Sequence, residues 1–170
     1  MALYKLFVPI QAVGASLVYF DFFNPGGAGI DVKLKSVAPV VSGAVAVTGF
    51  VAVDLFLTRT TAVGTGGTAA TAEGTSLTAA TFTALDSDQP LTLSLCSARL
   101  TPTGGATAGA VLSFDSVSTE ETNAGTYTPP TNLVDGDVLI KGGTGFRVIQ
   151  GGVASVGNIG FNVILDVTRR

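Results

Sequence analysis

Apolar and polar residues alternate one by one in several short stretches, and this alternation limits the possible fold more than any other feature of the chain. In "IDVKLK", Ile30, Val32 and Leu34 alternate with Asp31, Lys33 and Lys35. The pattern returns in "LTLSL" and in "FNVILDVTRR". Successive side chains of a strand point to opposite faces, so each stretch predicts a β-strand with one buried face. In "FVAVDLFLTRT" both faces carry apolar residues, which predicts packing on both sides.

Clusters of Gly, Pro, Asn and Asp separate the candidate strands, and no segment combines the apolar spacing of a helix with a capping signal. We expect strands near residues 2–10, 16–23, 30–38, 44–59, 90–99, 109–117, 136–141, 145–150 and 158–168. This number of strands in one domain spanning residues 1–170 predicts an all-β fold, a single β-sandwich of the jelly-roll type.

Two stretches do not fit compact strand-turn-strand spacing. Residues 60–85 and 118–132 are long, rich in Thr, Ala and Gly, and nearly without alternation. Long loops in compact domains are usually functional or disordered. We interpret residues 60–85 as an extended arm that lies on a neighbouring subunit, and a mobile surface loop is the alternative.

Residues 133–157, "LVDGDVLIKGGTGFRVIQGGVASVG", contain seven glycines. A phosphate-binding loop needs Lys-Ser/Thr after its glycines and then a helix. Here Lys141 precedes the glycines and a strand-like run follows them. Glycine accepts the positive φ of tight turns, so we expect hairpin turns that join strand 136–141 to strand 145–150 and that strand to the last one.

The inventory of reactive side chains is small. The chain has no histidine and a single cysteine, Cys96, in the apolar run "LTLSLCSARL". Histidine is the commonest general base, and a lone cysteine forms neither an intrachain disulfide nor a thiolate cluster. We interpret Cys96 as a buried structural thiol and expect no enzyme, no catalytic residues, no cofactor and no cofactor-binding residues.

Short carboxylate clusters are the remaining candidates for chemistry. They are Asp86 with Asp88, Glu120 with Glu121, and Asp135 with Asp137. Hard oxygen ligands of this kind bind calcium, but none of the clusters has EF-hand spacing and turn capping by Asp is commoner. We therefore expect no metal site, with a weak calcium site as the alternative. A carboxylate pair that meets only in space, as in glycosidases, stays open.

Two apolar stretches bear on membranes and export. Pro9 and Gln11 interrupt the first, residues 1–20, so we do not expect a signal peptide. The second, residues 36–53, carries no charge, but Pro39, two glycines and many valines favour two strands and a turn over a spanning helix. We expect no membrane partner.

Only 12% of the residues are charged, against 46% apolar. So little charge predicts that much of the outer surface is neutral Thr, Ser, Gly and Ala, and that part of the apolar surface is buried between the subunits of a homo-oligomer. The net charge of −3, with nine scattered basic residues, argues against nucleic acid as a partner.

The order of these segments resembles small structural proteins of tailed bacteriophage virions, particularly capsid decoration (cement) and minor head proteins. The likeness lies in "LYKLFVPIQAVGASLVYFDFFNPGG", "IDVKLKSV", "DLFLTRTTAVGTGGTAATA", "ALDSDQPL", "DGDVLIKGGTGFRVI" and "FNVILDVTRR". The resemblance implies a β-sandwich protein, often trimeric, that is made in the host cytoplasm and sits on the capsid surface of the virion. There it would bind the major capsid protein and stabilise the shell.

A rival interpretation is a host-surface or carbohydrate-binding module on the virion, with an exposed groove that carries aromatics and carboxylates. The cementing role predicts a broad, neutral underside instead. The sequence leaves the binding residues themselves undetermined.

Overall fold

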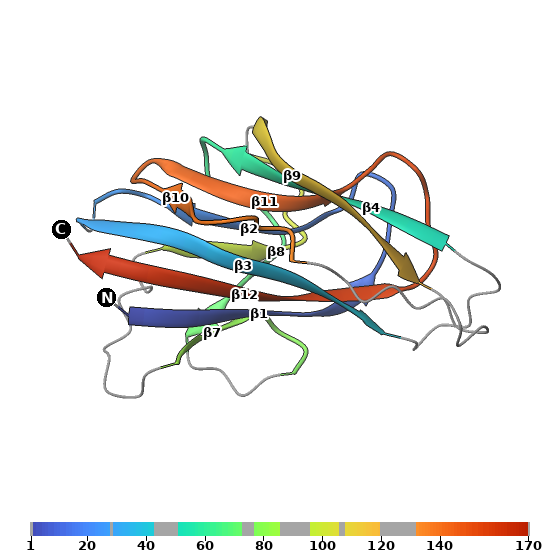
Figure 1. The fold of residues 1–170 in the computed structure, drawn as a ribbon, viewed down its shortest axis with the longest axis horizontal. Coiled ribbons are helices and arrows are strands. Elements are labelled where there is room, and N and C mark those ends of the chain that lie inside the picture. Colours follow the sequence, from blue (N-terminus) through green and yellow to red (C-terminus); the bar gives the residue numbers. More distant parts are fainter. Residues whose placement is uncertain are drawn as a thin grey trace.

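Every regular element in the described residues is a β-strand. The computed structural model describes residues 2–27, 29–42, 51–72, 77–85, 96–105, 108–119 and 132–169. These form two six-stranded sheets that pack face to face, and no helix occurs in these ranges (Figure 1). The strands are β1 (Ala2–Ala12), β2 (Val18–Asn24), β3 (Ile30–Ser42), β4 (Val51–Thr60), β5 (Thr68–Ala69), β6 (Thr71–Ala72), β7 (Thr81–Ala84), β8 (Ser97–Leu100), β9 (Ala108–Thr119), β10 (Val138–Ile140), β11 (Thr144–Gln150) and β12 (Asn158–Arg169).

The strand order is that of a jelly roll. Sheet A has the order β10-β3-β12-β1-β7-β6, and sheet B has the order β5-β8-β2-β11-β4-β9. The blocks β10-β3-β12-β1 and β2-β11-β4-β9 make an eight-stranded double-sheet jelly roll, because every connection within this set except β4 to β9 crosses between the sheets. Strands β5 to β8 are an insertion between β4 and β9. The predicted all-β sandwich of the jelly-roll type is confirmed.

The first and last strands are neighbours in the middle of sheet A. β1 pairs antiparallel with β12, and Ala2 lies opposite Val167. Both ends of the described chain therefore lie at the same end of the sandwich (Figure 1).

Most predicted strands appear within a few residues of their expected bounds. The expected strand 44–59 is β4, and the expected strand 90–99 is β8. Residues 44–50 and 90–95 lie outside the described residues. No helix in the described part of the chain is long and apolar enough to cross a membrane. The uncharged stretch 36–53 instead supplies the end of β3 and the start of β4, with residues 43–50 outside the described residues.

The expected hairpins around the glycine-rich stretch are wrong. β10 pairs with β3 in sheet A, whereas β11 pairs with β2 and β4 in sheet B, and the chain returns to sheet A in β12. The turn at Gly142 and Gly143 therefore carries the chain from one sheet to the other. Gly143 has φ 79°, and a Cβ on Gly142 would lie 2.5 Å from the Cα of Gly26. Glycine is required here because the chain turns sharply and passes close to Gly26 as it crosses from one sheet to the other.

The described part of residues 60–85 pairs with strands of its own chain, and its expected contact with a neighbouring subunit stays a prediction. β5 pairs with β8, β6 pairs with β7, and β7 pairs with β1. The segment thus extends one edge of each sheet of its own chain, and Phe82 anchors it in the core at 4% exposure. In the second expected arm, residues 118–119 end β9, residues 120–131 lie outside the described residues, and Asn132 accepts a hydrogen bond from the Val37 amide (2.8 Å).

Aromatic rings fill the space between the sheets. Phe146 stacks on Phe22 with centroids 5.4 Å apart and meets Phe20 edge-on at 6.0 Å. Phe161, from the opposite sheet, lies 5.4 Å from Phe20 and 5.3 Å from Tyr19. The alternating residues Ile30, Val32, Leu34, Phe161, Val163, Leu165 and Val167 are all at most 3% exposed, as the sequence pattern predicts.

Candidate functional site on the outer faces of the sheets

Cys96 is half-buried and immediately precedes β8. Burial raises the pKa of its thiol to about 12. The thiolate is the reactive form of cysteine, so this shift keeps the side chain in its unreactive form at neutral pH.

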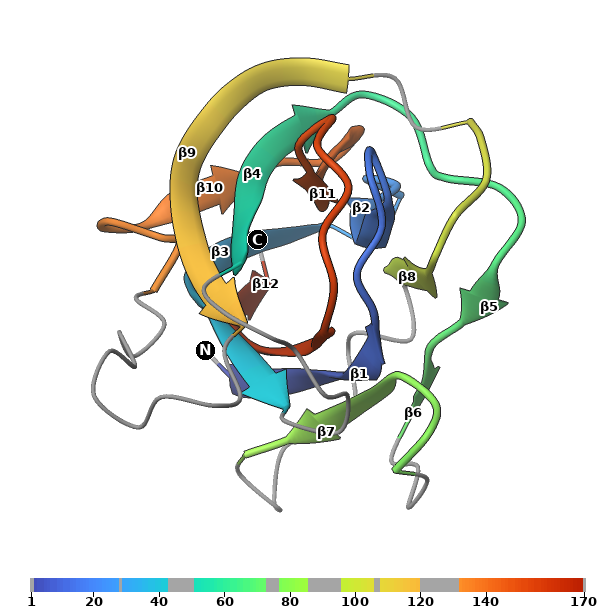
Figure 2. The same ribbon diagram turned by 90° about the vertical axis from the view of Figure 1, so that its right-hand side faces the viewer.

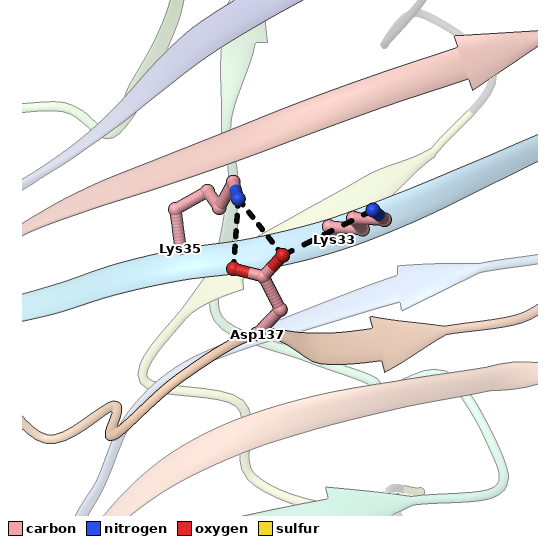
Figure 3. A network of polar contacts seen from close by, with 3 residues as sticks. All are labelled: Lys33, Lys35 and Asp137. Carbon is pink, nitrogen blue, oxygen red and sulfur yellow. Dashed lines mark hydrogen bonds and ion pairs between the residues drawn. The ribbon is translucent and has the colours of Figure 1, made fainter.

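The acidic residues in the described part of the chain do not form a metal site. Both carboxylate oxygens of Asp137 accept hydrogen bonds from the Lys35 ammonium, at 2.7 and 2.8 Å. The Asp137 Oδ2 also lies 3.9 Å from the Lys33 Nζ (Figure 3). The hydrogen bond from Lys35 lowers the pKa of Asp137. Asp135 is exposed, and Asp86, Asp88, Glu120 and Glu121 lie outside the described residues. Among the described residues, no three acidic or thiol side chains gather closely enough to hold a metal ion.

Among the described residues, two cavities that open on the surface each include one charged residue in their lining. The first, about 410 Å³, lies between residues 14–18 and residues 102–104 and includes Arg147. The second, about 480 Å³, lies between the turn at Pro25 and the turn at Lys141. Neither lining includes the acid and base pair that proton transfer needs.

Asp21 is a buried carboxylate on β2 that the sequence analysis did not single out. It is 1% exposed, its Oδ2 accepts the Gly64 amide at 2.7 Å, and its Oδ1 accepts the Arg99 amide at 3.1 Å. In register it lies between Arg147 of β11 and Arg99 of β8. Burial raises the pKa of Asp21, while the two amides and the two arginines oppose the rise. Its role is to hold the chain that follows β4 against β2.

This raised pKa predicts how stability changes with pH. In the unfolded chain Asp21 ionises near its ordinary pKa of 3.8, below the pKa it has in the folded protein. The unfolded state therefore releases the proton first, so the contribution of Asp21 to folding falls as the pH rises from 3.8 through the folded value. We expect the stability difference between the wild type and Asp21→Asn, measured by urea unfolding from pH 3 to pH 6, to shrink across that window. A difference that grows with pH would contradict the shift.

One outer surface lies at the end of sheet A far from the chain termini. Ile10 and Val40 are 49% and 38% exposed, and Gly160 of β12 lies between them. The neighbouring row across the sheet is Ala38, Asn162 and Phe7. We call these six residues the sheet A patch, and none of them is charged.

A second apolar row crosses sheet B. The register places Ile149 of β11, Phe56 of β4 and Phe114 of β9 side by side. The rings of Phe56 and Phe114 have centroids 4.8 Å apart, and Phe114 is 54% exposed. Asp54 accepts a short hydrogen bond from the Ser116 hydroxyl beside this row. β4 buries Val53, Leu55 and Leu57 between the sheets, whereas Phe56 on its other face contacts Phe114 of the same sheet.

Comparison with protein-family models, curated proteins and solved structures found no match.

Proposed function

We propose that the chain is a non-enzymatic virion structural protein that assembles as a homo-oligomer and stabilises a bacteriophage capsid by binding the major capsid protein. The observation that carries the proposal is the sheet A patch, an uncharged and partly exposed apolar surface on an open sheet face. Isolated exposed apolar residues are common, but a contiguous set on a sheet face that no other described strand covers is typical of an interaction site.

The fold gives supporting context. Double-sheet jelly rolls occur in viral capsid proteins and also in lectins and cupins, so the architecture agrees with a structural role without fixing it. Each patch is small and its contact would be weak. Many copies bound on a symmetric shell would act together through avidity.

The carbohydrate-binding alternative has one arrangement in its favour, the Phe56 and Phe114 rings beside Asp54. The two rings are tilted by 36° and lie at the sheet edge, so they do not form a flat stacking platform. Binding on a glycan array, without binding to capsid shells, would support this alternative and overturn the proposed function.

The direct test is co-sedimentation of the purified chain with expanded, undecorated capsid shells from the same source. Saturable binding together with a higher melting temperature of the shells would support cementing. Binding that leaves the melting temperature unchanged would contradict stabilisation.

A charge in the sheet A patch should weaken shell binding. Ile10→Lys places an ammonium where the proposal requires apolar contact, and we expect about tenfold weaker binding or more, as for loss of an interface hot spot. Leu3→Lys is the matched control, because Leu3 also lies on β1, is 42% exposed and is at the other end of the sheet. Equal loss in the two variants would reject the sheet A patch as the contact.

A further inference from the structure

Strand β9 is the long open edge of the sandwich. The other three sheet ends are formed by β5, β6 and β10, which have two, two and three residues. β9 has 12 residues and, in the described part of the chain, pairs with β4 alone. Figure 2 shows β9 on the side of the sandwich opposite β5 and β6.

The second half of β9, from Ser113 onward, lacks the usual protections of an edge strand. Proteins guard such edges with short strands, lysines, prolines or bulges, because unpaired backbone groups attract other strands. β9 reads "AGAVLSFDSVST", with one charged residue, no lysine and no proline. The shifts in its register with β4 all lie before Ser113, so the strand is regular from Ser113 onward.

The backbone of Phe114 points toward the open side. The Gly151 amide donates to the Asp54 carbonyl at 2.9 Å, so Asp54 directs its backbone groups toward β11. Alternation along an antiparallel strand gives Phe56, two residues later, the same direction. Phe56 and Phe114 thus face each other as a non-hydrogen-bonded pair, and the N–H and C=O of Phe114 point away from β4.

The side chain of Phe114 adds an apolar end to this edge. It closes the row of Ile149, Phe56 and Phe114 and is 54% exposed at the point where the sheet stops. Phe114 therefore presents its backbone N–H, its backbone C=O and its aromatic ring at the same point of the edge.

We propose that β9 is an assembly edge on which a second copy of the chain adds its own β9, antiparallel and centred on Phe114. Sheet B then continues from one copy into the next. Phe114 and Phe114 of the partner subunit exchange two backbone hydrogen bonds, and the apolar rows of the two copies meet on one face. Such a two-fold interface is isologous and gives a dimer, in place of the trimer that the resemblance implies.

A second copy fits this edge because the register avoids like charges. With Phe114 at the centre, Asp115 lies opposite Ser113 of the partner subunit, so the two carboxylates do not face each other directly. The Ser116 amide, which points to the open side like that of Phe114, donates to Asp115 Oδ1 of its own chain at 2.8 Å, so pairing beyond the Phe114 centre requires this side chain to release it. Opposite pairs of aromatic residues stabilise antiparallel strands.

Cysteine cross-linking tests the register. In a Cys96→Ser background, Phe114→Cys places two thiols on a hydrogen-bonded antiparallel pair with Cα atoms about 5.5 Å apart, a separation that suits a disulfide. Oxidised glutathione should convert this variant to a covalent dimer. Ser116→Cys is the matched control, since positions 116 of the two copies would lie about 13 Å apart. Equal yields at the two positions, or no dimer at either, would overturn the register.

Solution mass tests the interface without added cysteines. We expect light scattering to give twice the chain mass of 17.1 kDa for the wild type and a single chain for Phe114→Lys, which sets two ammonium groups against each other at the two-fold axis. Ile10→Lys is the control, because Ile10 is 49% exposed on the other sheet and its variant should remain a dimer. A monomeric wild type, or an oligomer that Phe114→Lys leaves intact, would overturn the inference.

This inference rests on the homo-oligomer of the proposed function and names the edge that forms it. Dimers that cross-link at position 114 but ignore capsid shells would keep the assembly edge and reject the cementing role. Monomers that bind shells would reject the assembly edge and keep the cementing role.

Discussion

Phe146→Ala should lower the free energy of unfolding by about 3–5 kcal/mol, the usual cost of truncating a buried phenylalanine. Phe146 is 0% exposed and contacts both Phe20 and Phe22, so its loss leaves a cavity lined by rings that cannot close it. Domains of ordinary stability have about 5–15 kcal/mol in total. Urea unfolding followed by circular dichroism gives the measurement, since the chain has no tryptophan.

Leu77→Ala is the control for this substitution. It also removes an apolar side chain, but Leu77 is 82% exposed, and we expect a change within about 0.5 kcal/mol. A loss below about 1 kcal/mol for Phe146→Ala would mean that Phe146 does not belong to a tightly packed core.

Asp21→Ala should have the second-largest effect. The substitution removes the acceptor of two backbone amides, those of Gly64 and Arg99, and each buried donor left without a partner costs about 1–3 kcal/mol. It also removes the carboxylate that lies, in the register of sheet B, between Arg99 of β8 and Arg147 of β11. We expect a lower urea midpoint and faster proteolysis near residues 61–67.

Asp137→Ala gives the contrast for Asp21. Asp137 lies on the surface and its partners Lys33 and Lys35 are both solvent-exposed. Exposed ion pairs stabilise proteins little, so we expect an unchanged urea midpoint. If both variants lost stability equally, the special role of the buried carboxylate would be rejected.

The strands and the core were predictable because burial imposes a period of two on the sequence. Ile30, Val32 and Leu34 show that period without interruption, and the strand that contains them was placed within a few residues. The path between strands was not predictable, because a glycine turn such as Gly142 and Gly143 looks alike whether the chain returns in its own sheet or crosses to the facing one.

The edges and the surfaces were harder to predict for a related reason. The segment 60–85 lacks alternation, and its attachment depends on Phe82 reaching the core and on backbone pairing, which any sequence can provide. Asp21 could have been suspected as the single charge within "VYFDFFN". The amides that bond to Asp21 belong to Arg99 of β8 and to Gly64 in the chain after β4, and only the sheet topology brings them next to Asp21.

The pairing of β1 with β12 has a consequence for how the protein is made. Sheet A lacks its centre until residues 158–169 have left the ribosome, because β12, which lies between β1 and β3, is synthesised after all the other described strands. Such distant pairing makes folding slow, and it leaves the edges of β1 and β3 open while the nascent chain waits. A chain interrupted shortly before β12 would lack its central strand and enter aggregates, rather than fold as a slightly shorter copy.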